Sequence, residues 1–304
     1  MIEIARRSRA RSEIYHLKAL GPVGAAQFNG ALSLIATARD EGLPVTADAY
    51  PYAASGTGLD AAMPPWVQEG GLEAWIGRLA DRDIRRRVLA EMQIAEPSWE
   101  NHLRLAGGGD QVLLSGFKSR GLKHLTGRTL SDVARDRSTS SEEAAMDLVI
   151  KDRSRVEAIY FNQSEEVLRT VLAQPWVSLG SDEASLAPEP PFLASNPHPR
   201  AYGTFARFLG RFVREERIVA LSEAIRRITS LPAENLGLTH RGRVRPGAFA
   251  DLVIFDPDTI TDCAGYDAPH QYAVGVDHVI VNGQVTLLDG AHTGVRARRA
   301  IRRT

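Results

Sequence analysis

Cysteine is almost absent from this chain of 304 residues, which contains only Cys263. One cysteine cannot form an intrachain disulfide, so a disulfide framework is excluded and a reducing compartment is expected, with the cytoplasm as the default. No run of about 18 uninterrupted apolar residues is present, and the N-terminus lacks the long apolar core of a signal peptide. We therefore expect no membrane-spanning helix.

An excess of charge of either sign is also missing, because Lys plus Arg and Asp plus Glu both number 37. A balanced chain indicates neither a nucleic-acid partner nor a membrane partner. Basic residues gather only near the C-terminus, at Arg296, Arg298, Arg299, Arg302 and Arg303. We interpret this cluster as a solvated tail, with nucleic-acid binding as the alternative.

Several common functional motifs are absent. The sequence has no glycine-rich phosphate-binding loop, no paired-cysteine motif, no Gly-x-Ser-x-Gly nucleophile elbow and no internal repeat. Its 43% hydrophobic and 24% charged residues are typical of an ordinary globular protein. Because these motifs are absent, we look for candidate catalytic residues at the ends of the predicted strands.

Short apolar runs alternate with helical patterns up to about residue 238. Strands are expected at 12–17, 45–52, 112–115, 156–161 and 176–179, and helices at 25–41, 72–92, 144–150, 165–172, 201–216 and 222–231. This alternation predicts parallel βαβ units, interrupted by an insertion that is rich in charge and includes 72–92. In such folds the catalytic loops gather at the C-terminal ends of the strands.

The pattern changes after Leu238. A turn-rich stretch at 241–247 precedes a predicted strand at 250–255, and two further β runs at 276–281 and 284–288 are joined by Asn282-Gly283. Asn-Gly between two β runs is a strong signal for a two-residue hairpin. The last 65 or so residues are therefore predicted to form a small all-β unit.

Asp182 is the leading candidate for a catalytic residue, because it follows the apolar run that ends in Ser178-Leu179-Gly180-Ser181. A carboxylate at the C-terminal tip of a buried strand can transfer protons. Arg200 follows in Pro197-His198-Pro199-Arg200, where the rigid backbone would direct its guanidinium toward a carboxylate. The alternatives are an N-cap role for Asp182 and a surface ion pair for Arg200.

Histidines and tyrosines supply the other candidates. His16 ends the first predicted strand, where it could bind a metal if further ligands converge on it, or serve as a hydrogen-bonded core histidine. His198 could bind substrate or be structural. Asp48, Tyr50 and Tyr52 alternate along one predicted strand and so share a face. Tyr50 is a substrate-binding candidate, and structural packing of the tyrosines is the alternative.

Several segments carry a resemblance to a known family when they are taken in order. They are His16–Gly21, Val45–Tyr52, Ala158–Asn162, Gly180–Asp182, Pro197–Phe205 and Arg241–Asp256. Together they resemble the N-acyl-D-amino-acid deacylase (D-aminoacylase) family of the amidohydrolase superfamily. The resemblance implies an α/β fold: the C-terminal half of a TIM-like (β/α)8 barrel at 1–238, with strands five to eight and an insertion, and a small all-β sandwich with the basic C-terminal tail at 239–304.

The resemblance also implies a function, the zinc-dependent hydrolysis of N-acyl-D-amino acids to a D-amino acid and a carboxylate. His16 matches the metal-binding histidine of the fifth strand, Asp182 the catalytic aspartate of the eighth, and Arg200 the arginine that holds the substrate's α-carboxylate. Zinc lowers the pKa of bound water to about 7. Asp182 would then take its proton and return it to the leaving amine.

Three departures from the family pattern affect this expectation. The first four barrel strands, with their His-x-His pair and metal-binding cysteine, have no counterpart, and Cys263 lies in the predicted β domain. The sixth strand offers only Asp48 and Tyr50 where a second histidine is usual. The usual Gly-Ser-Asp-Gly ends here in Glu183. One recognisable ligand holds zinc poorly, since catalytic sites generally use about three protein ligands.

A partial barrel also leaves exposed strand edges. We therefore expect this chain to need a complementary N-terminal half or to form a homo-oligomer, with no nucleic-acid or membrane partner. The alternatives are an inactive fragment or non-catalytic subunit of an amidohydrolase, and a dihydropyrimidinase-like hydrolase of cyclic amides.

Overall fold

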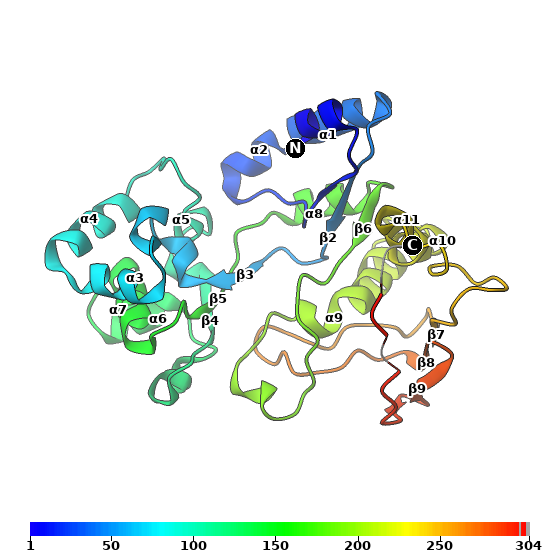
Figure 1. The fold of residues 1–304 in the computed structure, drawn as a ribbon. Coiled ribbons are helices and arrows are strands. Elements are labelled where there is room, and N and C mark those ends of the chain that lie inside the picture. Colours follow the sequence, from blue (N-terminus) through cyan, green and yellow to red (C-terminus); the bar gives the residue numbers. More distant parts are fainter. Residues whose placement is uncertain (298, 302–304) are drawn as a thin grey trace.

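The computed structural model describes residues 1–297 and 299–301. Of the C-terminal basic cluster, Arg298, Arg302 and Arg303 lie outside the described residues. Figure 1 shows three parts: a parallel sheet with its helices, a separate lobe built mainly from residues 55–160, and an antiparallel sheet near the C-terminus.

The helices and strands follow the predicted pattern closely in their order. The helices are α1 (Ile2–Ser8), α2 (Gly21–Asp40), α3 (Leu72–Ala80), α4 (Arg82–Met92), α5 (His102–Leu105), α6 (Leu130–Asp136), α7 (Ser141–Asp152), α8 (Glu165–Leu172), α9 (Arg200–Arg207), α10 (Leu221–Ile228) and α11 (Ser230–Leu236). A π-helical turn, η6 (Phe208–Glu215), continues α9. The strands are β1 (Ser12–Ile14), β2 (Val45–Ala49), β3 (Ser55–Gly58), β4 (Val112–Gly116), β5 (Glu157–Tyr160), β6 (Val177–Leu179), β7 (Leu252–Phe255), β8 (Val276–Val281), β9 (Gln284–Leu288) and β10 (Ala291–His292).

The parallel sheet has the strand order β1-β2-β6. The strand predicted at 156–161 forms as β5, but it does not join this sheet. It pairs antiparallel with β3 and β4 in the lobe. The expectation that this strand belongs to the parallel βαβ series is therefore wrong, because a short apolar run specifies an extended segment but not its partner.

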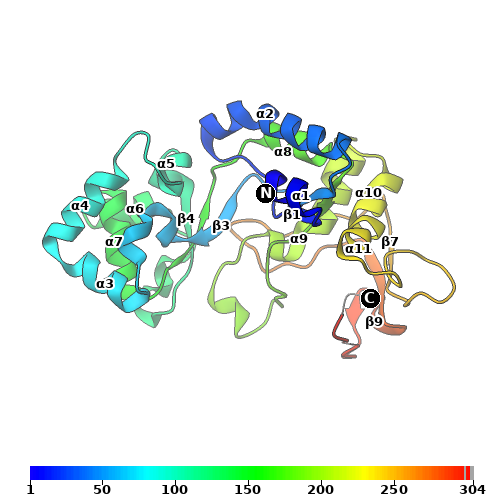
Figure 2. The same cartoon turned by 45° about the horizontal axis from the view of Figure 1, so that its top comes forward.

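The outer face of the parallel sheet is apolar and covered by helices. Val45, Ala47 and Val177 are fully buried in one core with Phe28 of α2 and Val171 of α8. Figures 1 and 2 both show α2 and α8 on the same side of the sheet. The apolar faces of these two helices thus pack against the strands, and this packing fixes the positions from which the loops at the strand ends begin.

The inner face of the same sheet is polar and open. Glu13, Thr46 and Asp48 line a cavity of about 710 Å³ there, together with Leu236 and other residues. The Thr46 hydroxyl donates a hydrogen bond to the Glu13 carboxylate. Within residues 1–297 and 299–301, both outer strands, β1 and β6, lack a further neighbour. The sheet is therefore a segment with two free edges rather than a closed barrel.

The lobe contains the predicted insertion with its helix at 72–92, and it has its own hydrophobic core. It also takes in the segments at 112–115 and 144–150, which the alternating pattern places in the parallel βαβ series, so that expectation is wrong for them as well. Its antiparallel sheet β3-β5-β4 packs against helices that include α3, α6 and α7. The predicted helix at 72–92 is divided at Asp81, whose carboxylate accepts hydrogen bonds from the backbone N–H groups of Asp83 and Ile84. That side chain caps α4 and explains the break.

The C-terminal sheet has the order β10-β9-β8-β7 and is antiparallel throughout. The predicted hairpin is confirmed, since Asn282 and Gly283 join β8 to β9 with φ values of 50° and 79°. Two successive positive φ angles are what a type I′ turn requires. The part of the chain that the structure describes supplies one β sheet to this region, and a sandwich requires a second.

Among the described helices, none has the length and apolar character needed to cross a bilayer.

Arg227 of α10 fixes the start of β6. It is completely buried, and it donates hydrogen bonds to the carbonyl oxygens of Val177 at 2.6 Å and Leu172. Burial lowers the pKa of this guanidinium to about 10. A cation held in this way connects the end of α8 to the strand that leads to Asp182.

We predict that Arg227→Ala lowers the free energy of unfolding by about 3 kcal/mol, because it leaves a cavity and two buried carbonyl groups without a donor. Urea unfolding provides the measurement. The control is Arg135→Ala, which removes an exposed ion pair with Asp132 and should leave stability nearly unchanged. An equally small effect for Arg227→Ala would contradict this interpretation.

Candidate functional site

Three of the predicted site residues follow neighbouring strands of the parallel sheet. His16 lies after β1, Tyr50 after β2, and Asp182 after β6. Because parallel strands end at the same edge of a sheet, these residues meet at one rim. Arg200 reaches the same rim from the first residue of α9.

Asp182, which is partly buried, forms an ion pair with the buried Arg200. Nη1 of Arg200 lies 2.8 Å from Oδ2 of Asp182, and the arginine side chain is only 5% exposed. The hydroxyl of Tyr15 donates a hydrogen bond of 2.5 Å to Oδ1 of the same carboxylate. The alternative of a surface ion pair for Arg200 is therefore wrong: the pair exists, but its guanidinium is enclosed.

Tyr50 connects Arg200 to the end of β1. The Arg200 guanidinium carbon lies 4.6 Å from the centre of the Tyr50 ring, a cation–π contact. The Tyr50 hydroxyl accepts hydrogen bonds of 3.1 Å from Lys18 Nζ and from Gln163 Nε2. Two cations therefore contact this buried tyrosine, one through its ring face and one mainly through its hydroxyl.

His198 is buried and uses both ring nitrogens. Its Nδ1 accepts a 3.1 Å hydrogen bond from the backbone N–H of Arg200, which leaves Nε2 to donate to the carbonyl of Ala54 at 3.2 Å. The rings of Tyr50 and Tyr52 lie 6.2 and 5.2 Å from its own. Burial, reinforced by the charge of Arg200, lowers the pKa of His198. These contacts position Arg200, and a direct contact of His198 with substrate stays a prediction.

His16 adopts a left-handed backbone conformation with φ of 39°, and its N–H donates to Oδ1 of Asp48 at 2.8 Å. Burial raises the pKa of Asp48. Across residues 1–297 and 299–301, no group of three His, Cys, Asp or Glu side chains is arranged to hold a metal ion. By themselves, these residues therefore do not fit a catalytic zinc site, which generally uses about three protein ligands.

A cavity of about 340 Å³ lies beside Arg200, between the parallel-sheet part and the lobe. Arg200, His198 and Glu183 line one side, and Arg155 and Glu157 of the lobe line the other. Arg155 is already paired with Asp60 at 2.9 Å. The cavity therefore offers one deeply buried cation, Arg200, to a ligand of small-molecule size.

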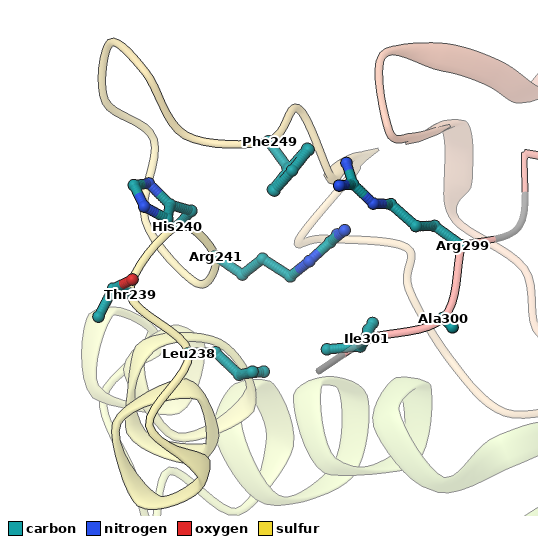
Figure 3. Close-up of a pocket in the computed structure, with 8 residues that line it drawn as sticks. All are labelled: Leu238, Thr239, His240, Arg241, Phe249, Arg299, Ala300 and Ile301. Carbon is teal, nitrogen blue, oxygen red and sulfur yellow. The ribbon is translucent and has the colours of Figure 1, made fainter. Parts of the chain in front are cut away.

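A second cavity, of about 360 Å³, is shown in Figure 3. The guanidinium groups of Arg241 and Arg299 lie 4.4 and 4.7 Å from the centre of the Phe249 ring. Arg241 is also paired with Asp251. None of the predicted site residues lines this cavity, so it is not the candidate active site.

Sequence reasoning missed the neighbours that complete the site. Tyr15 and Lys18 flank His16, and their contacts with Asp182 and Tyr50 join strand ends far apart in the sequence. Their position beside a candidate metal ligand was the available signal. In the sequence Glu183 stands out only as a departure from a family pattern, and the structure places its carboxylate 3.6 Å from Arg200.

Comparison with known proteins identifies the class. The model of the amidohydrolase family matches residues 28–287, so this chain belongs to that family. The predicted resemblance to D-aminoacylases is confirmed: the chain is 36% identical to D-aminoacylase of Alcaligenes xylosoxydans xylosoxydans over 64% of its own length and 39% of that protein's. It is 30% identical to the N-acyl-D-glutamate deacylase of the same organism, over 93% of this chain and 46% of that one.

A solved structure gives the same result for the fold. The N-acyl-D-glutamate deacylase of Bordetella bronchiseptica, complexed with zinc and a phosphonate inhibitor, matches with a TM-score of 0.71 and 28% identity. The match covers 94% of this chain and 48% of that chain. This chain therefore spans less than half the length of each of these three proteins.

We predict that His198 makes stability depend on pH. Its lowered folded-state pKa means that the unfolded chain, whose histidine titrates near about 6.5, binds a proton that the folded chain does not. The free energy of unfolding should thus fall as pH decreases below about 6.5. His198→Gln should remove up to about 1.4 kcal/mol per pH unit of that slope, measured by urea unfolding between pH 5 and 8. Identical slopes in both proteins would contradict the neutral, buried histidine.

Proposed function

We propose that this chain supplies the C-terminal part of the active site of a zinc-dependent N-acyl-D-amino-acid deacylase. The reaction is hydrolysis of the amide bond to give a D-amino acid and a carboxylate. The observation that carries the proposal is the meeting of Asp182 and Arg200 at the strand ends of a parallel sheet. Membership of the amidohydrolase family and similarity to proteins named for such substrates support it.

Arg200 is the proposed anchor for the substrate's α-carboxylate. It is a buried cation beside a cavity of about 340 Å³, and a guanidinium can bind a carboxylate through two parallel hydrogen bonds. Its contacts with Tyr50 and His198 hold it in place before substrate arrives. Tyr50 and His198 therefore act, in this proposal, mainly by positioning the arginine.

Asp182 is the proposed proton-transfer group. A carboxylate within hydrogen-bond reach of a bound amide can accept a proton from the attacking water and deliver one to the leaving amine. The Tyr15 hydroxyl and the Arg200 guanidinium fix the orientation of its two oxygens. Asp182 does not itself line the cavity of about 340 Å³, but its carboxylate lies 2.8 Å from the Arg200 guanidinium, and Arg200 does line it.

The proposal requires residues from outside this chain. The open sheet, its two free edges and its polar inner face over a cavity of about 710 Å³ indicate a surface that other strands cover. We propose that an N-terminal half of the (β/α)8 barrel covers it, adds the second sheet of a sandwich, and brings metal ligands to join His16. The coverage of less than half of the related deacylases supports this proposal.

One observation favours a second candidate function, that of a non-catalytic subunit or inactive fragment. The described part of the chain holds no group of three metal-binding side chains. The cyclic-amide alternative has weaker support, because a buried arginine beside the cavity suits a substrate with a free carboxylate.

We predict that the isolated chain binds less than one equivalent of zinc after dialysis against a micromolar concentration of the metal. The reason is that, among the described residues, no group of three His, Cys, Asp or Glu side chains is arranged to hold a metal ion with His16. Elemental analysis of the dialysed protein provides the measurement, and His16→Ala is the control for binding at that residue. Tight binding of a full equivalent that depends on His16 would contradict the need for outside ligands.

We predict that turnover of N-acetyl-D-amino acids appears when the chain is co-expressed with the N-terminal half of the Alcaligenes D-aminoacylase and supplied with zinc. Asp182→Asn should then lower kcat by about 100-fold or more. Arg200→Met should chiefly raise KM, by about 10- to 100-fold, through lost carboxylate binding.

N-acetyl-L-amino acids serve as the control substrates in this assay. Full activity of the Asp182→Asn protein would remove Asp182 from the reaction. A folded, zinc-loaded complex without turnover would favour the non-catalytic subunit.

A further inference from the structure

Glu183 directs its carboxylate to the same guanidinium as Asp182. Its Oε2 lies 3.6 Å from Nε of Arg200, while Oδ2 of Asp182 lies 2.8 Å from Nη1. The side chains are 24%, 17% and 5% exposed for Glu183, Asp182 and Arg200 respectively. Two acids from consecutive positions therefore share one buried cation.

The geometry leaves donors of Arg200 unused. Within the described part of the chain, its Nε and Nη1 are buried and have no hydrogen-bond partner. The contact with Glu183 is too long for a hydrogen bond, and the contact with Asp182 lacks the required angles. The charge of the guanidinium is offset, but these two buried donors make no hydrogen bond to the acids that face them. An anion that displaced Glu183 with better geometry, such as a carboxylate bound through two oxygens, would gain those hydrogen bonds.

The cavity beside Arg200 contains further negative charge. Glu183 lines it directly, and so does Glu157 from the opposite side. A ligand carboxylate entering the cavity must approach Arg200 next to Glu183, and like charges at such distances repel each other strongly where water is partly excluded. Burial raises the pKa of Glu183, which reflects the same loss of solvent.

We propose that Glu183 determines ligand specificity by competing with a ligand's carboxylate for Arg200. This inference rests on the proposed function, in which Arg200 holds the substrate's carboxylate. Glu183 acts through Arg200 rather than on the reacting bond, so it is a positioning residue. It weakens the binding of acids in this cavity relative to neutral ligands of the same shape.

The test compares two ligands that differ only in charge, N-acetyl-D-alanine and N-acetyl-D-alaninamide. Isothermal titration calorimetry gives the Kd of each for the full chain and for Glu183→Gln. We expect the Kd of the acid to fall about tenfold in the variant, with the Kd of the amide changing less than about twofold. A merely structural role for Glu183 would change both values together.

Two further variants keep the test decisive. Glu183→Gly removes the side chain entirely, which covers the case in which the Gln side chain distorts the loop. It should also lower the Kd of the acid without changing that of the amide. Glu157→Gln is the matched control: it removes the same charge from a residue that lines the cavity but is exposed, so that solvent screens it, and that makes no ion pair with Arg200 among the described contacts. We expect a change of less than about twofold for both ligands.

The proposal is overturned if Glu183→Gln and Glu183→Gly leave the Kd of the acid unchanged, or if acid and amide change equally. It is also overturned if no form of the chain binds the acid, because this chain itself supplies Arg200 and both competing carboxylates. The experiment measures binding without turnover. A failure of the deacylase function in the co-expression assay therefore leaves its result intact, and the two failures are distinguishable.

Discussion

The buried guanidinium of Arg200 is the constraint on which the site depends. A cation taken out of water needs nearby negative charge, and here Asp182 and Glu183 provide it. Meeting that requirement draws the end of β6 toward the start of α9. His198 and Tyr50 complete the enclosure, one through the backbone of Arg200 and the other through its ring face. The same arrangement that stabilises the charge also presents it to a cavity.

The second constraint is the incomplete sheet. Three parallel strands have a well-packed apolar face under α2 and α8 and a polar face that borders open space. In the function we propose, such a sheet contributes Asp182 and Arg200 to the site, and the described residues hold no group of three metal-binding side chains.

The features that could be predicted from the sequence are those set by a few neighbouring residues, such as turns. Asn282-Gly283 can form few other turns, and the hairpin between β8 and β9 follows directly. The meeting of Asp182 with a guanidinium was also expected, since Asp182 follows a strand of the parallel sheet and the Pro197–Arg200 segment comes shortly after it, although Arg200 itself begins α9. The pairing of β5 with β3 and β4 could not be read from the sequence, because an apolar run of this length fits either sheet. The contacts of Tyr15 and Lys18 depend on tertiary distances that spacing does not reveal.

A double-mutant cycle between Asp182 and Arg200 tests the central claim most directly. The free energy of unfolding is measured in urea for the unmodified chain, Asp182→Asn, Arg200→Met and the double variant. If the two charges are paired in the buried site, the coupling energy should reach about 1.5 kcal/mol or more, with the double variant less destabilised than the sum of the single ones. Additive effects within about 0.3–0.5 kcal/mol would show that the two side chains do not interact and would contradict the account.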